Sequence, residues 1–272
     1  MAFVAGIVLF NPEILRLKEN IDAIAPQVQT VILVDNGSEN QKEIASFLES
    51  YQSIIYIRNK ENVGIAKALN QIVYKADDLG YEWVLTLDQD TVCNPGIIEA
   101  YETAIRKEKN LGMVSSQFAD RNTQINFNSD GEIQDIDFCI TSAAFTNIEA
   151  VKSVGGFDEK MFIDMVDYDI CYALKRNGYR IVRVNYLGFL HEVGRSEERN
   201  FLGKKTIVFN HSYMRKYYWV RNSIYLMRKY NLNKGHEYKR IFKRMLDTLF
   251  FEKQKFTKIK WMFKGIKDGN RL

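Results

Sequence analysis

Cysteine, proline and long apolar runs are scarce in this sequence, and each scarcity excludes a class of protein. Cys93, Cys139 and Cys171 are the only cysteines in 272 residues and lack CxxC spacing. This excludes a disulfide framework and indicates buried, inert thiols in a reduced, cytoplasmic protein. No uncharged run approaches the roughly 20 residues of a membrane span, so we expect any membrane contact to be peripheral. With three prolines, no low-complexity tract and no internal repeat, a disordered or solenoid chain is also excluded.

The apolar content is high enough for a large globular core. Hydrophobic residues make up 46% of the chain and charged residues 26%, which fits one large domain or one domain with an appendage. Residues 3–10 are apolar, but no basic segment precedes them and Asn11-Pro12 follows. We therefore expect a buried strand there rather than a signal peptide.

Strand and helix patterns alternate along the first half of the chain. Apolar runs predict strands at 3–10, 30–34, 54–58 and 83–87, and helical spacing predicts helices at 13–25, 42–51, 64–75 and 95–107. This alternation predicts an α/β fold with a mostly parallel central sheet flanked by helices. Farther along we expect strands at 113–117, 139–145, 181–184 and 188–191, a hairpin-like insertion at 120–137, and helices at 148–154 and 168–177.

Basic residues concentrate at the end of the chain. Residues 201–272 contain 19 lysines and arginines against four acidic residues, a net charge of +15, whereas residues 1–200 carry −11. The shift predicts a catalytic domain at 1–200 and a basic, mainly helical C-terminal extension at 201–272 that packs on it, with helices at 213–230 and 238–251.

Polar residues follow three of the predicted strands. Asn11, Asp35 and Asp88 each come just after an apolar run, and the carboxyl ends of strands are where open α/β sheets bind ligands. In Asp88-Gln89-Asp90 the two carboxylates point the same way in an extended turn. They can hold a divalent cation that neutralises a diphosphate. The alternative is that both acids are turn and helix-capping residues.

Two further segments fit the same crevice. Asp35 begins the turn Asp-Asn-Gly-Ser, where a carboxylate can accept the imide N–H of a pyrimidine base, although ordinary turn chemistry explains the turn as well. Asn62 and Gly64 open the segment NVGIAKALN. A glycine at a helix start lets a phosphate or sugar approach the backbone, and the alternative is a capped helix that packs by its apolar side.

An acidic segment and one histidine complete the candidates. Asp164, Asp167 and Asp169 lie at the start of the helix expected near 168, where acids also favour the helix dipole. Apolar neighbours can tune such a carboxylate toward general-base chemistry. His191 ends an apolar strand, where a hydrogen-bonded core histidine is the alternative to a ligand.

These motifs, in this order, resemble the inverting family-2 glycosyltransferases of the GT-A fold, and within them the bacterial rhamnosyltransferase-like branch. The resemblance spans about residues 4–230 and rests on Asn11-Pro12, VDNGS, NVGIAKALN, LDQD, GGFDE, FIDMVDYD, His191 and YYWVRNSIYL. It is weaker in one place, because Tyr172-Ala173-Leu174 occupies a stretch where the family often has an arginine.

The resemblance implies a role for each candidate residue. Asp35 would read the pyrimidine, with Asn11, Asn62 and Gly64 lining the nucleotide pocket. Asp88 would contact the ribose or donor sugar, and Asp90 and His191 would coordinate Mn²⁺ or Mg²⁺. Asp167 would be the general base, with Asp169 as the second candidate.

The resemblance also implies substrates. The donor would be dTDP-L-rhamnose, and the acceptor a saccharide or lipid-linked saccharide in bacterial cell-surface polysaccharide synthesis. A UDP-hexose donor is the alternative within the family. From a different class, a non-catalytic sugar-nucleotide or glycan-binding module is the rival, as is a haloacid-dehalogenase-type phosphatase suggested by the spacing of Asp88, Asp90 and Val92. That phosphatase motif closes a first strand, whereas here it closes the fourth.

The basic extension supports a separate hypothesis. Lysines and arginines alternate with aromatic and aliphatic residues at 213–230 and 250–266, which is typical of amphipathic helices on an anionic membrane surface. We therefore expect a cytoplasmic protein that is peripheral at the inner face of the plasma membrane. The alternative is that these helices pack on the domain with solvated lysines. Nucleic acid is not expected as a partner, because no binding motif accompanies the charge.

Overall fold

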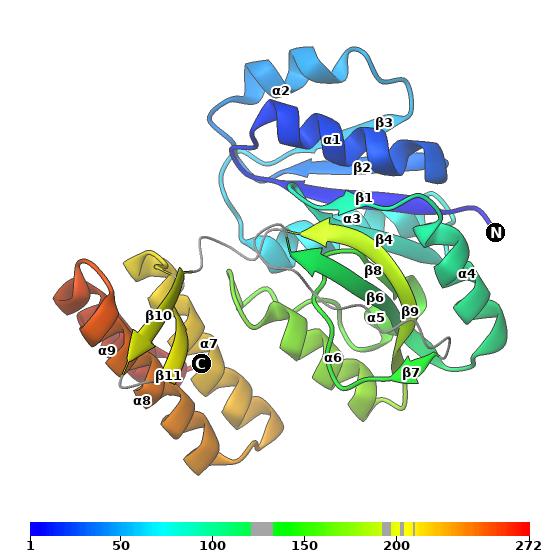
Figure 1. The fold of residues 1–272 in the computed structure, drawn as a ribbon. Coiled ribbons are helices and arrows are strands. Elements are labelled where there is room, and N and C mark those ends of the chain that lie inside the picture. The colour runs from blue at the N-terminus through cyan, green and yellow to red at the C-terminus, as the bar shows by residue number, and fades with distance from the viewer. Residues whose placement is uncertain (121–132, 192–196, 202–203, 209) are drawn as a thin grey trace. The chain divides into compact units, whose positions relative to one another are not determined.

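The computed structural model describes residues 1–120, 133–191, 197–201, 204–208 and 210–272 (Figure 1). The chain divides into two compact units. Unit 1 comprises Met1–Lys160 and Val166–Glu192, and unit 2 comprises Met161–Met165 and Val193–Leu272. These units are defined by packing. The predicted functional domains, a catalytic domain at 1–200 and an extension at 201–272, stay a proposal.

A single sheet forms the centre of unit 1. Four strands of the first half lie parallel, in the order β3 (Ile54–Arg58), β2 (Thr30–Asp35), β1 (Val4–Leu9) and β4 (Trp83–Asp88). Next to β4, the short antiparallel β8 (Ala144–Asn147) leads to β6 (Leu111–Asp120), and β6 pairs in parallel with β9 (Arg180–His191). The short strands β5 (Val92–Cys93) and β7 (Gln134–Asp135) pair antiparallel with β9. The predicted mostly parallel α/β sheet is confirmed.

Helices cover both faces of this sheet (Figure 1). They are α1 (Ile14–Ile24), α2 (Gln41–Leu48), α3 (Ile65–Asp78), α4 (Ile97–Lys107), α5 (Ile148–Ser153) and α6 (Val166–Arg176), with a short 3₁₀ turn at Ala25–Gln27. Because side chains alternate along a strand, Ala5, Ile7 and Leu9 of β1 share one core with α1, α2 and α4. Gly6 faces the other way, against Ile72 of α3.

Two sequence-based expectations about the second half are wrong. The strand expected at 139–145 begins only at Ala144, and the preceding residues form a loop in which Ala143 has a φ of 53°. The strands expected at 181–184 and 188–191 are one long strand, β9, with irregular register opposite Gln117 of β6. Of the hairpin expected at 120–137, residues 121–132 lie outside the described residues.

The described residues of unit 2 form three long helices and a two-stranded sheet. The helices are α7 (Tyr213–Tyr230), α8 (Lys234–Phe251) and α9 (Lys255–Gly269), and the strands β10 (Glu197–Phe201) and β11 (Lys204–Val208) pair antiparallel. The helices share a small apolar core of Val220, Ile224, Met227, Ile241 and Met262. Within the described part of the chain, no helix is both long and apolar enough to cross a bilayer.

Candidate active site

Three of the predicted site residues converge at one end of the sheet. Asp88 ends β4, Asp90 follows two residues later, and His191 ends β9. One ligand atom from each lies within 4.8 Å of the others, and the Nδ1 atom of His191 lies 3.9 Å from Oδ1 of Asp90. Ligands about 2 Å from a metal ion lie up to about 4 Å apart. Two carboxylates and an imidazole at this spacing therefore fit a divalent cation after a small closure.

The buried hydroxyl groups of Thr91 and Ser142 form hydrogen bonds to two of these three residues. Thr91 Oγ1 lies 3.1 Å from Nδ1 of His191 and 2.6 Å from Oγ of Ser142. The same serine oxygen accepts a hydrogen bond from the backbone N–H of Asp88, at 3.0 Å. Both hydroxyl side chains are buried, so they fix the backbone of one ligand and the ring of another. Neither residue could be identified from the sequence, since a lone threonine and a lone serine form no recognisable motif.

Asp167 is held by Thr141, the residue that precedes Ser142 in the chain. Asp167 lies in the first turn of α6, rather than before the helix as expected, and is half-buried. Its Oδ1 accepts a hydrogen bond of 2.9 Å from the hydroxyl of Thr141, and the backbone N–H of Thr141 lies 3.4 Å away. The carbonyl of Thr141 in turn accepts a bond of 2.6 Å from Thr86 of β4. Thr141 and Ser142 thus tie Asp167 to the strand that carries Asp88.

The second candidate base is less accessible. Asp169 is 2% exposed, on the side of α6 that faces the interior. An acceptor hydroxyl has better access to the half-buried Asp167. The geometry therefore favours Asp167 over Asp169 as a proton acceptor, and the assignment stays a prediction.

Asp35, predicted to read the base, is built into the turn after β2. Its Oδ1 accepts a hydrogen bond of 2.9 Å from the backbone N–H of Ser38, and its Oδ2 accepts one of 2.8 Å from the phenol of Tyr56. Burial, together with this hydrogen bond to a carboxylate, raises the pKa of Tyr56, so the phenol remains a donor. Asp35 is itself fully buried. The two hydrogen bonds show that Asp35 fixes the turn after β2. Its contact with a base stays a prediction.

The remaining donor-site candidates belong to turns that are bonded to each other. The backbone N–H of Asn11 donates to Ser38 at 2.8 Å. The side chain of Asn36 donates to Asn62 at 3.0 Å, and Asn62 also accepts the N–H of Gly64. Gly64 has a φ of 89° directly before α3, a conformation that suits glycine. The structure thus brings the three turns after β1, β2 and β3 together at the carboxyl edge of the sheet.

The segment before α6 belongs to unit 2 instead. The side-chain amide of Asn222 donates to the carbonyls of Ile163 and Asp164, at 2.8 and 2.9 Å. Arg215 forms an ion pair of 3.2 Å with Asp164. Burial raises the pKa of Asp164, and the charge of Arg215 only partly offsets it. The YYWVRN motif therefore holds the segment that precedes the candidate base.

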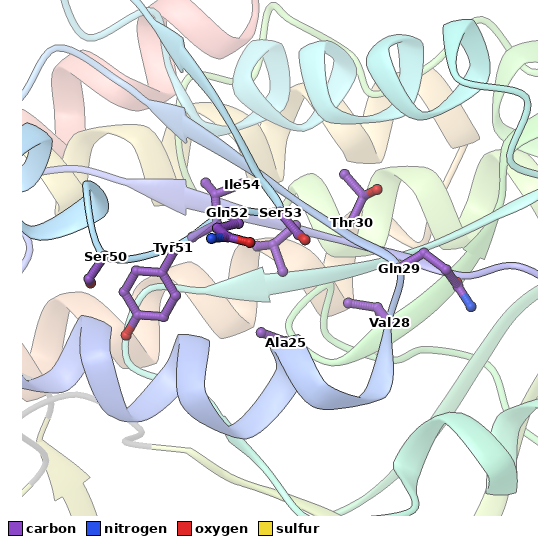
Figure 2. Close-up of a pocket in the computed structure, with 10 residues that line it drawn as sticks. Ala25, Val28, Gln29, Thr30, Ser50, Tyr51, Gln52, Ser53 and Ile54 are labelled. Carbon is purple, nitrogen blue, oxygen red and sulfur yellow. The ribbon is translucent and has the colours of Figure 1, made fainter.

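A separate pocket in unit 1 lies at the opposite edge of the sheet. Figure 2 shows it at the amino-terminal ends of β2 and β3, with Thr30, Tyr51 and Ile54 among the residues that line it. None of the predicted site residues lines it. The candidate active site is therefore the carboxyl edge, where the polar turns and the three ligand residues lie.

Comparison with known proteins identifies relatives of this chain. The sequence pattern of Glycosyl transferase family 2 matches residues 6–148. The chain is 27% identical over 242 residues to dTDP-rhamnosyl transferase RfbF of Shigella flexneri, covering 83% of this chain and 79% of that protein.

Solved structures show the same fold at low identity. S. aureus TarS 1–349 in complex with UDP-GlcNAc aligns with a TM-score of 0.61 at 14% identity, over 99% of this chain and 80% of that one. The mannosyltransferase PcManGT from Pyrobaculum calidifontis, in complex with GDP-Man and Mn²⁺, aligns with a TM-score of 0.58 at 14% identity, over 99% and 75%. Because the family pattern covers more than half of its length, the chain belongs to glycosyl transferase family 2.

Proposed function

We propose that this glycosyltransferase transfers L-rhamnose from dTDP-L-rhamnose, with inversion, to a saccharide or lipid-linked saccharide acceptor in bacterial cell-surface polysaccharide synthesis. The observation that carries the proposal is the link through Thr141 and Ser142, which joins a carboxylate at Asp167 to the ligand trio around Asp88. The choice of rhamnose rests on the similarity to RfbF, which extends over most of both chains.

Each residue has one task in this reaction. Asp88 contacts the ribose or sugar of the donor, Asp35 reads the pyrimidine base, and Asn11, Asn62 and Gly64 line the nucleotide pocket. Asp167 takes the proton of the acceptor hydroxyl as its oxygen attacks the anomeric carbon. The bond from that carbon to the diphosphate oxygen breaks with its electron pair, and the nucleoside diphosphate leaves.

Asp90 and His191 would hold Mn²⁺ or Mg²⁺, with Asp88 beside them. A bound divalent cation supplies positive charge that stabilises a leaving diphosphate. The mixed set of carboxylate and imidazole favours Mn²⁺, because Mg²⁺ prefers oxygen ligands throughout. Mn²⁺ is also the cation in the PcManGT complex.

The proposal has one alternative within the family. TarS was solved with UDP-GlcNAc, which favours a UDP-hexose donor as the second candidate. A non-catalytic sugar-nucleotide or glycan-binding module is the third. The joint presence of the ligand trio and an accessible Asp167 argues against it.

The proposed place of action is the cytoplasmic face of the plasma membrane, where a lipid-linked acceptor is presented. The acidic catalytic part and the basic extension of the chain differ strongly in charge. This division favours an extension that contacts an anionic surface. We propose no nucleic acid partner.

A donor screen tests the proposal. Thermal shift and nucleoside diphosphate release are measured with dTDP-L-rhamnose, UDP-GlcNAc and UDP-glucose, each with Mn²⁺. We expect the largest shift and the fastest release with dTDP-L-rhamnose. Greater stabilisation and turnover with a uridine sugar would show that the donor is a UDP-hexose and not dTDP-L-rhamnose. Nucleotide binding without turnover of any donor would support the binding module.

A further inference from the structure

The surface of residues 210–272 exposes basic side chains and keeps its acidic ones covered. The four acids in this stretch are Glu237, Asp247, Glu252 and Asp268, and none is exposed. Twelve of the lysines and arginines are exposed. Charges of one sign therefore dominate the outside of the three helices.

Hydrogen bonds explain why the acids lie inside. Glu252 is 7% exposed and bonds to the ammonium groups of Lys216 and Lys258. Burial opposes its ionisation, but the two lysines outweigh burial and lower the pKa of Glu252. Asp268 accepts a hydrogen bond of 2.9 Å from the phenol of Tyr217. These acids fix the helices to one another and do not neutralise the exposed lysines.

One face of α9 is fixed against α7. The residues on this face are Lys258, Met262, Gly265 and Gly269, all buried and spaced as one helical stripe. A Cβ atom on Gly265 would lie 2.7 Å from the carbonyl oxygen of Tyr217, and one on Gly269 would lie 2.5 Å from that of Arg221. The two helices are in contact at their backbones, so α9 cannot rotate about its axis without losing this packing.

The opposite face of α9 is exposed and both aromatic and basic. Phe256, Lys260, Phe263 and Lys267 follow one another at four, three and four residues, which places them on one stripe. Phe256 is 77% exposed and Phe263 is 60% exposed. Beside Phe256 the surface is hollowed, with Tyr213, Gln254, Lys255 and Thr257 around the hollow. Phenylalanine and lysine side by side are the composition of helices that lie in the headgroup region of an anionic bilayer.

We propose that this face of α9, Phe256, Lys260, Phe263 and Lys267, is the docking surface for an anionic lipid bilayer. The phenylalanine rings enter the boundary between headgroups and acyl chains, and the two ammonium groups pair with lipid phosphates. Because the face of α9 that contains Gly265 packs against α7, the opposite face with Phe256 and Phe263 stays exposed. Docking itself does not depend on the reaction; its purpose, to meet a lipid-linked acceptor, rests on the proposed function.

Vesicle sedimentation of the full chain tests the surface. Vesicles of phosphatidylcholine with and without phosphatidylglycerol are compared at low and high salt. We expect binding only to the anionic vesicles, and its loss at high salt. The double substitution Phe256→Gln/Phe263→Gln should reduce partitioning by about tenfold or more. Lys260→Gln/Lys267→Gln should reduce it about 25-fold, at roughly fivefold per lysine.

Matched controls on unit 1 remove two positive charges or two exposed hydrophobic side chains. Lys107→Gln/Lys109→Gln and Leu15→Gln/Tyr74→Gln alter exposed residues and should bind as the wild type does. Equal loss in the controls, or no loss in the α9 variants, overturns the proposal. A third result would also overturn it: size-exclusion chromatography shows a concentration-dependent dimer, and Phe256→Gln/Phe263→Gln abolishes the dimer but not vesicle binding. This face would then be the contact with a second copy of the chain.

A parallel assay separates the two proposals. Release of dTDP from dTDP-L-rhamnose without vesicles should be the same in the α9 variants and the wild type, and circular dichroism checks their folding. If no variant or wild type turns over any donor, the proposed function fails, and the sedimentation result still decides the docking surface.

Discussion

Removing one hydroxyl group should weaken catalysis without weakening donor binding. Thr141→Val keeps the shape of the side chain but deletes the donor that lies 2.9 Å from Oδ1 of Asp167. A hydrogen bond to a charged group contributes about 1.5–3 kcal/mol. The backbone N–H of Thr141 remains 3.4 Å from the same oxygen, so we take the lower end. About 1.5 kcal/mol corresponds to roughly a tenfold lower kcat, with the KM for the donor unchanged.

The assay is steady-state release of nucleoside diphosphate, with kcat and KM determined separately. Thr146→Val is the matched control, because Thr146 is a fully buried threonine whose hydroxyl has no hydrogen-bond partner within the described residues. It should retain wild-type kcat. A Thr141→Val enzyme with kcat within twofold of wild type would refute the argument that Thr141 positions the base, and an equal loss in both variants would show that packing alone is responsible.

Three further predictions test other parts of the molecule. Thr91→Val should weaken Mn²⁺ binding about tenfold or more, because it removes the contact at 3.1 Å that orients His191; electron paramagnetic resonance titration measures this without turnover, and unchanged affinity would remove Thr91 from the site. Gly37→Ala should cost about 3 kcal/mol of unfolding free energy in urea, since its φ is 82° and its Cβ would lie 2.5 Å from a backbone carbon. Gly80→Ala, at a φ of 80° with nothing within 4 Å, should cost about 1 kcal/mol, and equal losses would contradict the steric argument. Burial, together with the charge of neighbouring cations, lowers the pKa of His211 from 6.5 to about 3. The unfolded chain therefore binds a proton that the folded one does not as pH falls below about 6.5, and stability falls with it. The unfolding free energy of His211→Gln should decline less steeply than that of wild type between these pH values, and equal slopes would count against the shift.

The fold was predictable because its first half is locally consistent. Strands at 30–34, 54–58 and 83–87 match β2, β3 and β4 within a residue, since apolar runs bounded by polar turns leave few alternatives. Asp35 and Asp88 could be placed at the carboxyl edge for the same reason. The helix at 213–230 also matches α7.

The hydrogen bonds that hold the site residues in place could not be predicted, because they join residues far apart in the sequence. The sequence around Thr141 is apolar on both sides and predicts a strand. Its conformation instead depends on two hydrogen bonds to residues far away in the chain: the hydroxyl of Thr86 donates to the carbonyl of Thr141, and the hydroxyl of Thr141 donates to Asp167. In the same way, residues 161–165 pack in unit 2, where the side-chain amide of Asn222 donates hydrogen bonds to the carbonyls of Ile163 and Asp164. Local patterns contain no information about such partners.

The most direct test of the account compares two variants in one assay of nucleoside diphosphate release from dTDP-L-rhamnose with Mn²⁺. Asp167→Asn should bind the donor with wild-type affinity and lose about a hundredfold or more in kcat, as expected for a missing general base. Asp90→Asn should lose activity together with Mn²⁺ affinity, and chelation of the metal should stop the wild type. Full turnover by Asp167→Asn, or undiminished turnover by the chelated wild type, would contradict the central claim that a metal-bound donor and the Asp167 carboxylate act together.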